Sequence, residues 1–315
     1  MERKVYAIGD VGGTKTLLLL VDGDRQVLWR QRLRTPAGSP PEVVVETIDE
    51  ALSQGQREIG LDRRHLAGVG IGIAALLDFD EGVIYESPNL HWHEPIPFRR
   101  MMQECFPCPV YIDNDANAAV LGEATYGAAQ GHRYAAYITI STGIGGGLYL
   151  DGKVYRGSRG FAGEIGHIKR FGKGRRCGCG GEDCLEAWAS GEAMARSARE
   201  LWDESDPSIG PLNTAVVFDL AAAGNPLARF IIERAIEDIG TSLANLVTLL
   251  NLSCLVIGGG VAQNRSDFIA QLRDIINRAA IAPSVKVTRV EVVPARLGAE
   301  AGAWGMFAMM QASEC

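Results

Sequence analysis

Two glycine-rich loops constrain the fold of this chain more than any other feature, because each lies between apolar runs and precedes an Asp-Gly turn. Each copy consists of an apolar run, a loop, a second apolar run and the turn. These parts cover 5–9, 10–15, 16–21 and 22–23 in the first copy and 134–140, 141–147, 148–150 and 151–152 in the second. Asp-Gly favours a tight hairpin, since glycine accepts a positive φ. Two such strand–loop–strand units, about 130 residues apart, predict a duplicated α/β domain.

Further periodic segments complete two α/β lobes. Apolar residues recur at helical spacing in some segments and form short continuous runs, typical of buried strands, in others. The helical segments are 41–59, 116–126, 227–250 and 298–309, and the strands are 67–75, 110–112 and 255–257. A chain of 315 residues is long enough for two domains. We expect an N-terminal lobe over 1–120, a C-terminal lobe over 121–300, and a last helix, about 301–315, that packs back on the first lobe.

The charge balance argues against nucleic acid as a partner. The formal net charge is −7 and the chain has no long Lys/Arg run, whereas a phosphate backbone needs a basic face. We find no cleavable leader pattern and no apolar run of the roughly 20 residues that span a bilayer. The sequence therefore predicts a cytoplasmic protein without membrane contact. Seven cysteines, three of them clustered, fit a metal site in a reducing compartment better than a disulfide framework.

The glycine loops are candidate phosphate sites, because backbone N–H groups can converge on phosphate oxygens where no Cβ blocks the approach. In the first loop, Asp10 and Thr14 add a contact for hydrated Mg²⁺ and a hydroxyl donor. The stretch GDVGGTKT at 9–16 is one change from a P-loop. A P-loop must open a helix, whereas 17–23 has the pattern of a hairpin, so we disfavour that alternative. Two plain glycine-rich hairpins without a ligand are the other alternative.

A candidate acid–base group follows the strand 110–112. Asp113, Asn114, Asp115 and Asn117 lie where that strand meets the helix 116–126. A hydroxyl that attacks phosphorus needs a carboxylate within hydrogen-bonding reach to accept its proton. Asp and Asn are also preferred helix caps. Both functions can coexist, since one residue can cap the helix while another accepts the proton.

A third constellation has the composition of a zinc site. His167, Cys177, Cys179 and Cys184 have the spacing H-x9-C-x-C-x4-C, and Zn²⁺ prefers four such ligands in closed structural sites. Reduced cysteines in a glycine-rich loop are the plainer alternative. Glu164 and Glu186 flank this cluster and could accept hydrogen bonds from sugar hydroxyls, or could be solvated surface residues.

Together these stretches resemble the ROK family of sugar kinases and sugar-responsive repressors, within the actin/hexokinase/Hsp70-like (ribonuclease H-like) α/β fold. The matching stretches span nearly the whole chain in the family's order. They are 10–15, 88–92, 113–117, 141–147, 163–167, 177–180 with 184–186, and 258–260.

The resemblance implies a role for each matching residue. Asp115 would be the catalytic base acting on the 6-hydroxyl of a hexose. Sugar hydroxyls would be bound by Asn89, Asn114, Asp115, Glu164, His167 and Glu186. His167 would also join Cys177, Cys179 and Cys184 on a structural Zn²⁺. Nucleotide phosphates and Mg²⁺ would be bound by Asp10, Gly12, Gly13, Thr14, Lys15, Thr142 and Gly143, and adenosine would lie against Gly258, Gly259 and Gly260.

The chain departs from the family pattern at three places. Asp113 stands where the family usually has Glu, Ala74-Ala75 where it has Pro-Gly, and Asp183 where it has Gly. The proposed base is retained, so phosphoryl transfer stays the expected activity. The Ala74-Ala75 change leaves the identity of the sugar open.

The resemblance implies an ATP-dependent hexose 6-kinase acting most readily on glucose, with N-acetylmannosamine or N-acetylglucosamine as alternative acceptors. ATP is favoured over polyphosphate, because polyphosphate-using relatives tend to lack the cysteine cluster. A sugar-responsive regulator is the alternative of another class, although such repressors carry a helix-turn-helix before the first strand, which here starts by Val5. A non-catalytic sugar-binding module is disfavoured by the retained Asp115. Relatives are often dimers or tetramers, so we expect a homo-oligomer.

Overall fold

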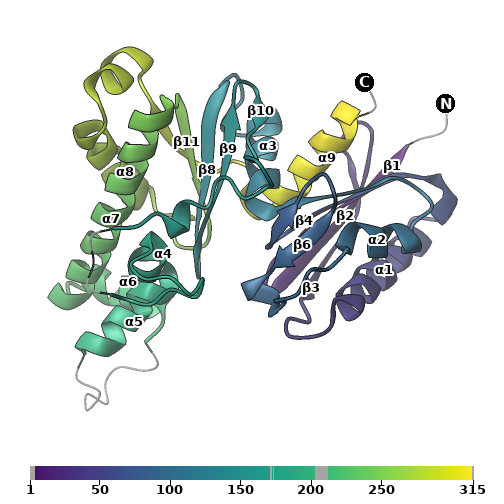
Figure 1. Cartoon of the computed structure of the whole chain (residues 1–315), viewed down its shortest axis with the longest axis horizontal. Helices are drawn as coiled ribbons and strands as arrows, with labels where there is room; N and C mark the ends of the chain where they lie inside the picture. The colour runs from purple at the N-terminus through teal and green to yellow at the C-terminus, as the bar shows by residue number, and fades with distance from the viewer. Residues whose placement is uncertain (1–3, 171, 173, 203–211, 314–315) are drawn as a thin grey trace. The chain divides into compact units, whose positions relative to one another are not determined.

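The computed structural model describes residues 4–170, 172, 174–202 and 212–313 (Figure 1). The chain divides into two compact units. Unit 1 consists of Met1–Gly131, Gly147–Gly163 and Ala299–Cys315, and unit 2 of His132–Gly146 and Glu164–Gly298. The structure has two five-stranded sheets and a separate two-stranded one. The expected two-lobed α/β architecture is therefore confirmed.

The first sheet lies in unit 1 and has the strand order β3-β2-β1-β4-β7. Its strands are β1 (Val5–Val11), β2 (Lys15–Asp22), β3 (Val27–Arg34), β4 (Leu66–Ile73) and β7 (Val110–Asn114). Strands β1, β2 and β3 are antiparallel neighbours, whereas β4 runs parallel to β1 and β7 parallel to β4. Only three residues separate β1 from β2, so the 10–15 stretch forms a hairpin. The P-loop alternative is excluded, because no helix follows this loop.

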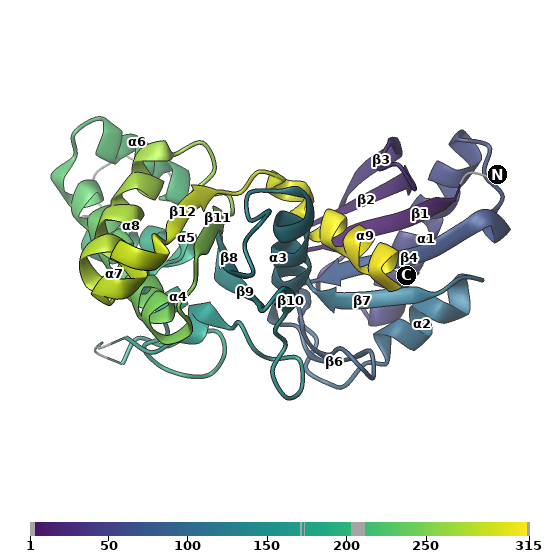
Figure 2. The same cartoon turned by 90° about the horizontal axis from the view of Figure 1, so that it is seen from above.

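Helices cover both faces of this sheet (Figure 2). Helices α1 (Pro41–Glu58) and α2 (Phe98–Cys105) pack on one face, and α9 (Ala301–Ser313) packs on the other. Strand side chains alternate between the faces. Ala7 and Val11 of β1 belong to the core on the α1 side, and Tyr6 and Ile8 to the core on the α9 side. Both faces are therefore apolar, which explains why β1 and β2 read as continuous apolar runs.

Helix α3 (Asp115–Tyr126) packs closely against α9. A Cβ added at Gly122 would lie 2.3 Å from the carbonyl oxygen of Ala301, and one at Gly305 would lie 1.7 Å from that of Ala118. Only glycine permits this approach of two helix backbones. Helix α9 thus packs closely on α3 within unit 1.

The second sheet has the order β10-β9-β8-β11-β12. Its strands are β8 (Tyr134–Ile140), β9 (Ile144–Leu150), β10 (Lys153–Val154), β11 (Cys254–Gly258) and β12 (Glu291–Pro294). Asp151 and Gly152 join β9 to β10 with φ values of 55° and 79°, as a tight Asp-Gly hairpin turn requires.

The second glycine loop is shorter than the sequence suggested. We expected a loop over 141–147, but β9 already begins at Ile144. The glycines at 145–147 are therefore strand residues. The reason at Gly147 is steric, because a Cβ there would lie 2.3 Å from the carbonyl oxygen of Ala116 at the start of α3.

The remaining elements frame the two sheets. They are β5 (Leu76–Asp78), β6 (Val83–Glu86), α4 (Leu185–Ala189), α5 (Gly191–Leu201), α6 (Thr214–Ala222), α7 (Pro226–Leu250) and α8 (Ser266–Ala279). Within the described ranges no single helix is both long and apolar enough to cross a membrane, and only α6 and α7 taken together, bent by 116°, reach that length and apolarity.

Candidate active site

The junction of β7 and α3 brings polar side chains to the N-terminus of a helix. The side-chain oxygen of Asn114 accepts hydrogen bonds from the N–H groups of Ala116 (2.9 Å) and Asn117 (3.0 Å), so Asn114 is the cap of α3. The Asn114 amide nitrogen donates to the carbonyl of Ala75 at 3.2 Å. Asp115 is the first residue of the helix, where the helix dipole favours a carboxylate. The cap and the proposed base are therefore different residues.

Asp10 and Asp115 influence each other electrostatically within unit 1. Burial, reinforced by the negative charge of Asp115, raises the pKa of Asp10 to about 8. Burial also raises the pKa of Asp115, and the nearby charge of Asp113 adds to that effect. A carboxylate made more basic in this way accepts a hydroxyl proton more readily.

Asp113 is buried and paired with an arginine. Its Oδ2 accepts hydrogen bonds from Nε (3.0 Å) and Nη2 (2.6 Å) of Arg156, and its side chain is only 1% exposed. Arg156 also lies over the ring of Phe79, 3.8 Å from its centroid. Sequence reasoning missed Arg156, because it lies in a loop outside any recognisable motif.

The Ala74-Ala75 segment positions residues of the proposed sugar site through backbone groups. Both alanines are buried. The carbonyl of Ala74 accepts from the hydroxyl of Ser87 (2.7 Å), and that of Ala75 accepts from Asn114. Ser87 directly precedes the short 3₁₀ helix Pro88–Leu90, which contains Asn89.

The loop between β1 and β2 lies beside Asn89 and borders a pocket. A Cβ at Gly13 would lie 2.8 Å from the Cβ of Asn89. The pocket has a volume of about 340 Å³ and is lined by Gly13, Thr14, Arg34, Thr35, Pro36 and Ala37. Lys15 lies opposite Arg34 in the pairing of β2 with β3, so two cationic residues lie beside this loop. The sequence analysis missed Arg34, which belongs to an otherwise unremarkable strand.

In unit 2, Glu186 holds the second glycine loop. Its Oε2 accepts a hydrogen bond from the N–H of Ile144 at 2.8 Å. A Cβ at Gly143 would lie only 2.3 Å from that same oxygen, so a larger residue there would displace the Glu186 carboxylate. The carbonyl of Thr142 accepts from the N–H of Glu192, the second residue of α5, at 3.2 Å. Glu186 is therefore a loop anchor and not a solvated surface residue.

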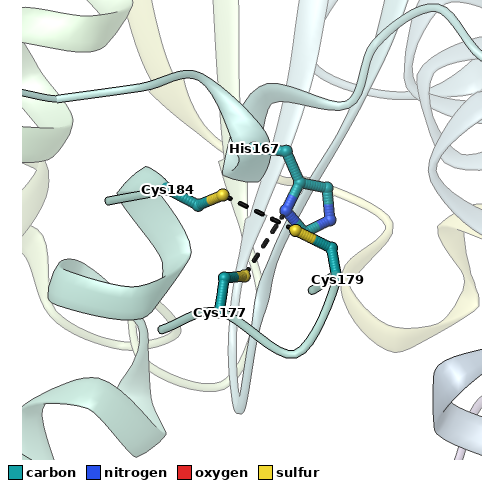
Figure 3. A group of neighbouring side chains, drawn as sticks. All are labelled: His167, Cys177, Cys179 and Cys184. Carbon is teal, nitrogen blue, oxygen red and sulfur yellow. Dashed lines mark hydrogen bonds between the residues drawn. The ribbon is translucent and has the colours of Figure 1, made fainter. Parts of the chain in front are cut away.

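His167, Cys177, Cys179 and Cys184 come together, as their spacing predicts (Figure 3). Their ligand atoms all lie within 4.8 Å of one another. The Cys179 and Cys184 sulfurs are 3.6 Å apart, and the Cys177 sulfur lies 3.7 Å from Nδ1 of His167. Tetrahedral zinc with Zn–S bonds of about 2.3 Å places its ligand atoms roughly 3.5–3.8 Å apart. The four residues therefore fit a closed structural zinc site.

Two charged side chains border this cluster. Nε2 of His167 lies 3.8 Å from Oε2 of Glu164, which leaves Nδ1 for the metal and gives the imidazole the outer carboxylate typical of zinc ligands. The Lys169 ammonium group donates to the Cys184 sulfur at 3.1 Å. A lysine in this position offsets part of the negative charge of three thiolates.

Asp183, one of the departures from the family pattern, stabilises the same loop. Its φ is 55°, in the left-handed region that favours glycine. Its carboxylate accepts hydrogen bonds from the N–H groups of Gly174 (2.9 Å) and Arg175 (3.1 Å) and from Nε1 of Trp188 (2.9 Å). These hydrogen bonds, with the N–H of Gly174 foremost, lower the pKa of Asp183. The aspartate therefore replaces a flexible glycine with a cross-linked turn.

The third glycine segment follows β11. Gly259 has a φ of 85°, and a Cβ there would lie 2.3 Å from the carbonyl oxygen of Ile140. The N–H of Val261 donates to that carbonyl at 2.9 Å. The Gly258 to Gly260 turn is thus packed on the end of β8, directly before the Ser141 to Gly143 loop.

Comparison with known proteins assigns the chain to one family. The ROK family model matches residues 5–313. A glucokinase of Streptomyces coelicolor is 31% identical over 310 residues, 94% of each chain. The bifunctional enzyme NanE/NanK of Brucella melitensis is 35% identical over 94% of this chain and 52% of its own length. A xylose repressor of Caldicellulosiruptor bescii is 27% identical over 90% of this chain and 72% of its own length.

Solved structures show the same fold. The ROK hexokinase from Thermus thermophilus is 36% identical, with a TM-score of 0.81 over 99% of this chain and all of that one. A ROK family glucokinase from Streptomyces griseus, in complex with glucose and AMPPNP, is 30% identical, with a TM-score of 0.82 over 98% and 99% of the two chains. The expected hexokinase-like fold is confirmed.

Proposed function

Because the chain belongs to the ROK family, we propose that it transfers the γ-phosphoryl group of ATP to the 6-hydroxyl of a hexose, with glucose as the leading acceptor. The observation that carries this proposal is Asp115, a carboxylate at the N-terminus of α3 whose pKa is raised by burial. The glucose and AMPPNP bound by the similar Streptomyces griseus enzyme support this choice of substrates.

In the proposed reaction, Asp115 accepts the proton of the sugar 6-hydroxyl as its oxygen attacks the γ-phosphorus and ADP leaves. General-base assistance of this kind contributes roughly 10²–10⁴-fold. The Asn114 amide, oriented by the carbonyl of Ala75, is placed to bind a neighbouring hydroxyl. Unit 2 contains three further candidates for binding sugar hydroxyls, which are Glu164, His167 and Glu186.

Phosphates bind, in this proposal, to the backbone of Gly12 to Thr14 and of Thr142 to Gly143. Lys15 and Arg34 give the first loop the positive charge that a polyanion needs. Asp10 would hold hydrated Mg²⁺, which offsets phosphate charge when bound with ATP. Gly258 to Gly260 would lie against adenosine.

The four-ligand cluster would hold Zn²⁺ in a structural role. Cys184 directly precedes α4, and α4 carries Glu186. Rigid attachment of Cys184 would therefore keep Glu186 directed at the N–H of Ile144.

Sequence identity to known relatives does not by itself select glucose as the acceptor. The NanE/NanK enzyme is 35% identical to this chain over 300 residues, against 31% over 310 residues for the Streptomyces coelicolor glucokinase, and Ala74-Ala75 alters the segment that orients Asn114. N-acetylmannosamine and N-acetylglucosamine therefore remain the alternative acceptors, and kcat/KM compared across the three sugars decides among them.

The proposal is tested with purified protein, ATP, Mg²⁺ and a panel of hexoses. We expect sugar-dependent ADP formation that falls about 10²–10⁴-fold in Asp115→Asn. Asp24→Asn, a change at an exposed turn residue, is the matched control and should retain wild-type turnover. If no sugar stimulates ADP formation, the chain is not a hexose kinase, and the sugar-responsive regulator gains support. If Asp115→Asn stays within a few-fold of wild type, Asp115 is not the base.

A further inference from the structure

Arg156 is held rigidly against the strand that leads to Asp115. Two of its nitrogens donate to one oxygen of Asp113, and its guanidinium carbon lies 3.8 Å from the centroid of the Phe79 ring. The other oxygen of Asp113 accepts the N–H of Asn114 at 2.9 Å. Asp113 therefore connects Arg156 directly to the backbone that carries Asn114 and Asp115.

The charges around Asp115 within unit 1 are mostly negative. The charge of Asp113, on β7, adds to the raised pKa of Asp115, and the charge of Asp115 in turn adds to the raised pKa of Asp10, on β1. Arg156 is the cation that pairs with Asp113. The next charged pair along the same loop is Arg159 with Asp78, 3.9 Å apart. Helix α9 presents Gly302, which has no side-chain charge, toward Asp10.

We propose that Arg156 is a positioning residue for Asp115, and that it sets the pH at which Asp115 ionises by neutralising Asp113. The inference rests on the proposed function, since it deepens the role of the proposed base. An arginine suits this task, because it keeps its charge at every accessible pH and binds a carboxylate through a planar fork.

Burial raises the pKa of Asp113, and the Arg156 charge opposes that rise. Without Arg156, Asp113 either stays charged beside Asp115 or takes up a proton itself. In the first case the charge of Asp113 makes Asp115 release its proton at higher pH, and in the second Asp113 itself does so, because two neighbouring carboxylates titrate as a coupled pair.

The experiment follows the carboxyl carbons of ¹³C-aspartate-labelled full-length protein by NMR as the pH is varied. Spectra of Asp113→Asn and Asp115→Asn assign the two signals. In Arg156→Gln the Asp115 titration should move up by about one pH unit, the size of shift that an unbalanced neighbouring charge produces. In Asp113→Asn it should move down.

The double variant Arg156→Gln/Asp113→Asn should titrate close to wild type, because both charges are gone. The double variant also leaves no unpaired buried charge, so its titration can be measured even if Arg156→Gln alone does not fold. Arg156→Lys should lie between wild type and Arg156→Gln. Arg159→Gln, an exposed arginine three residues away, is the matched control and should change nothing.

The acid limb of the kcat/KM profile for glucose should follow the NMR titration in each variant. An unchanged Asp115 titration in a folded Arg156→Gln protein overturns the inference, as does a double variant that stays shifted as far as Arg156→Gln. If the NMR shifts occur but Asp115→Asn keeps its turnover, the proposed base is wrong while the electrostatic role of Arg156 stands. If Asp115 is essential and its titration ignores Arg156, only this inference fails.

Discussion

Gly147 offers a sharp test of how strand packing controls the proposed base. Its missing side chain lets β9 pass the first turn of α3, which Asp115 begins. A Cβ at Gly147 would lie 2.3 Å from the oxygen and 2.8 Å from the carbon of the Ala116 carbonyl. Both contacts are with backbone, so no flexible side chain can move aside.

The substitution Gly147→Ala must therefore displace the backbone. Ordinary contact begins near 3.4 Å, so the new methyl and the Ala116 oxygen must separate by about 1 Å more. β9 is held between β8 and β10 and α3 is packed on α9, so the displacement must be shared between β9 and the first turn of α3, where Asp115 lies. A misplacement of about 1 Å at a catalytic group can cost on the order of 10²-fold in rate, equivalent to about 2.7 kcal/mol of transition-state stabilisation. Overpacking should also lower the free energy of unfolding by about 1–3 kcal/mol.

The assay compares kcat/KM for glucose at saturating ATP with the urea midpoint of the same protein. Gly23→Ala is the control, because a Cβ there meets nothing within 4 Å and its φ is not positive. It should match wild type in both measurements. A folded Gly147→Ala protein with kcat/KM within about threefold of wild type would refute the reasoning that this contact places Asp115.

Three further predictions concern the metal loop and Asp10. Cys184→Ser should reduce bound zinc well below one ion per chain by elemental analysis, whereas Cys105→Ser, outside the cluster, should not. Zinc release to a chelator should be slowest in wild type, faster in Asp183→Gly and fastest in Asp183→Ala. Glycine still favours the left-handed backbone conformation, whereas alanine disfavours that conformation and also lacks the hydrogen bonds of the aspartate. Equal release rates in the three proteins would contradict this. Asp10 has a folded-state pKa raised to about 8, so without nucleotide the folded protein holds a proton that the unfolded chain releases near pH 4. The wild-type protein should therefore lose stability relative to Asp10→Asn as the pH rises between about 4 and 8, with no further change above pH 8. If the melting temperatures of the two proteins change in parallel with pH, the raised pKa of Asp10 is wrong.

The sequence predicted local features well, because each depends on neighbouring residues. The short loop before Lys15 indicated a hairpin, and β1 and β2 form one. β2 and β3 also pair, but the connection runs from Gly23 to Gln26 and its positive φ of 69° is at Arg25, not at Gly23. The cysteine spacing predicted a cluster that the fold brings together. The same holds for the helix cap at Asn114, since Asp and Asn at a strand–helix junction favour capping.

Contacts between distant segments were not predictable in the same way. Arg156 meets Asp113 across 43 residues, and Glu186 meets Ile144 across 42. No local pattern encodes either pair. The start of β9 was also misjudged, because a run of glycines indicates a loop unless a neighbouring backbone excludes larger residues, and that neighbour belongs to α3. The sequence showed only that Asp183 stands where the family usually has glycine, and the hydrogen bonds that its carboxylate accepts could not be predicted from that departure.

The packing of α9 on α3 has a consequence for synthesis of the chain. Unit 1 is assembled from three separate stretches, and its final stretch begins at Ala299. A nascent chain that has left the ribosome only through Gly298 already contains every residue of unit 2. Its α3, however, still lacks the helix whose backbone meets Gly122, and one face of the first sheet is still bare. Every residue of unit 2 therefore precedes α9 in the chain, whereas the packing around the aspartates of unit 1 is complete only once α9 is in place.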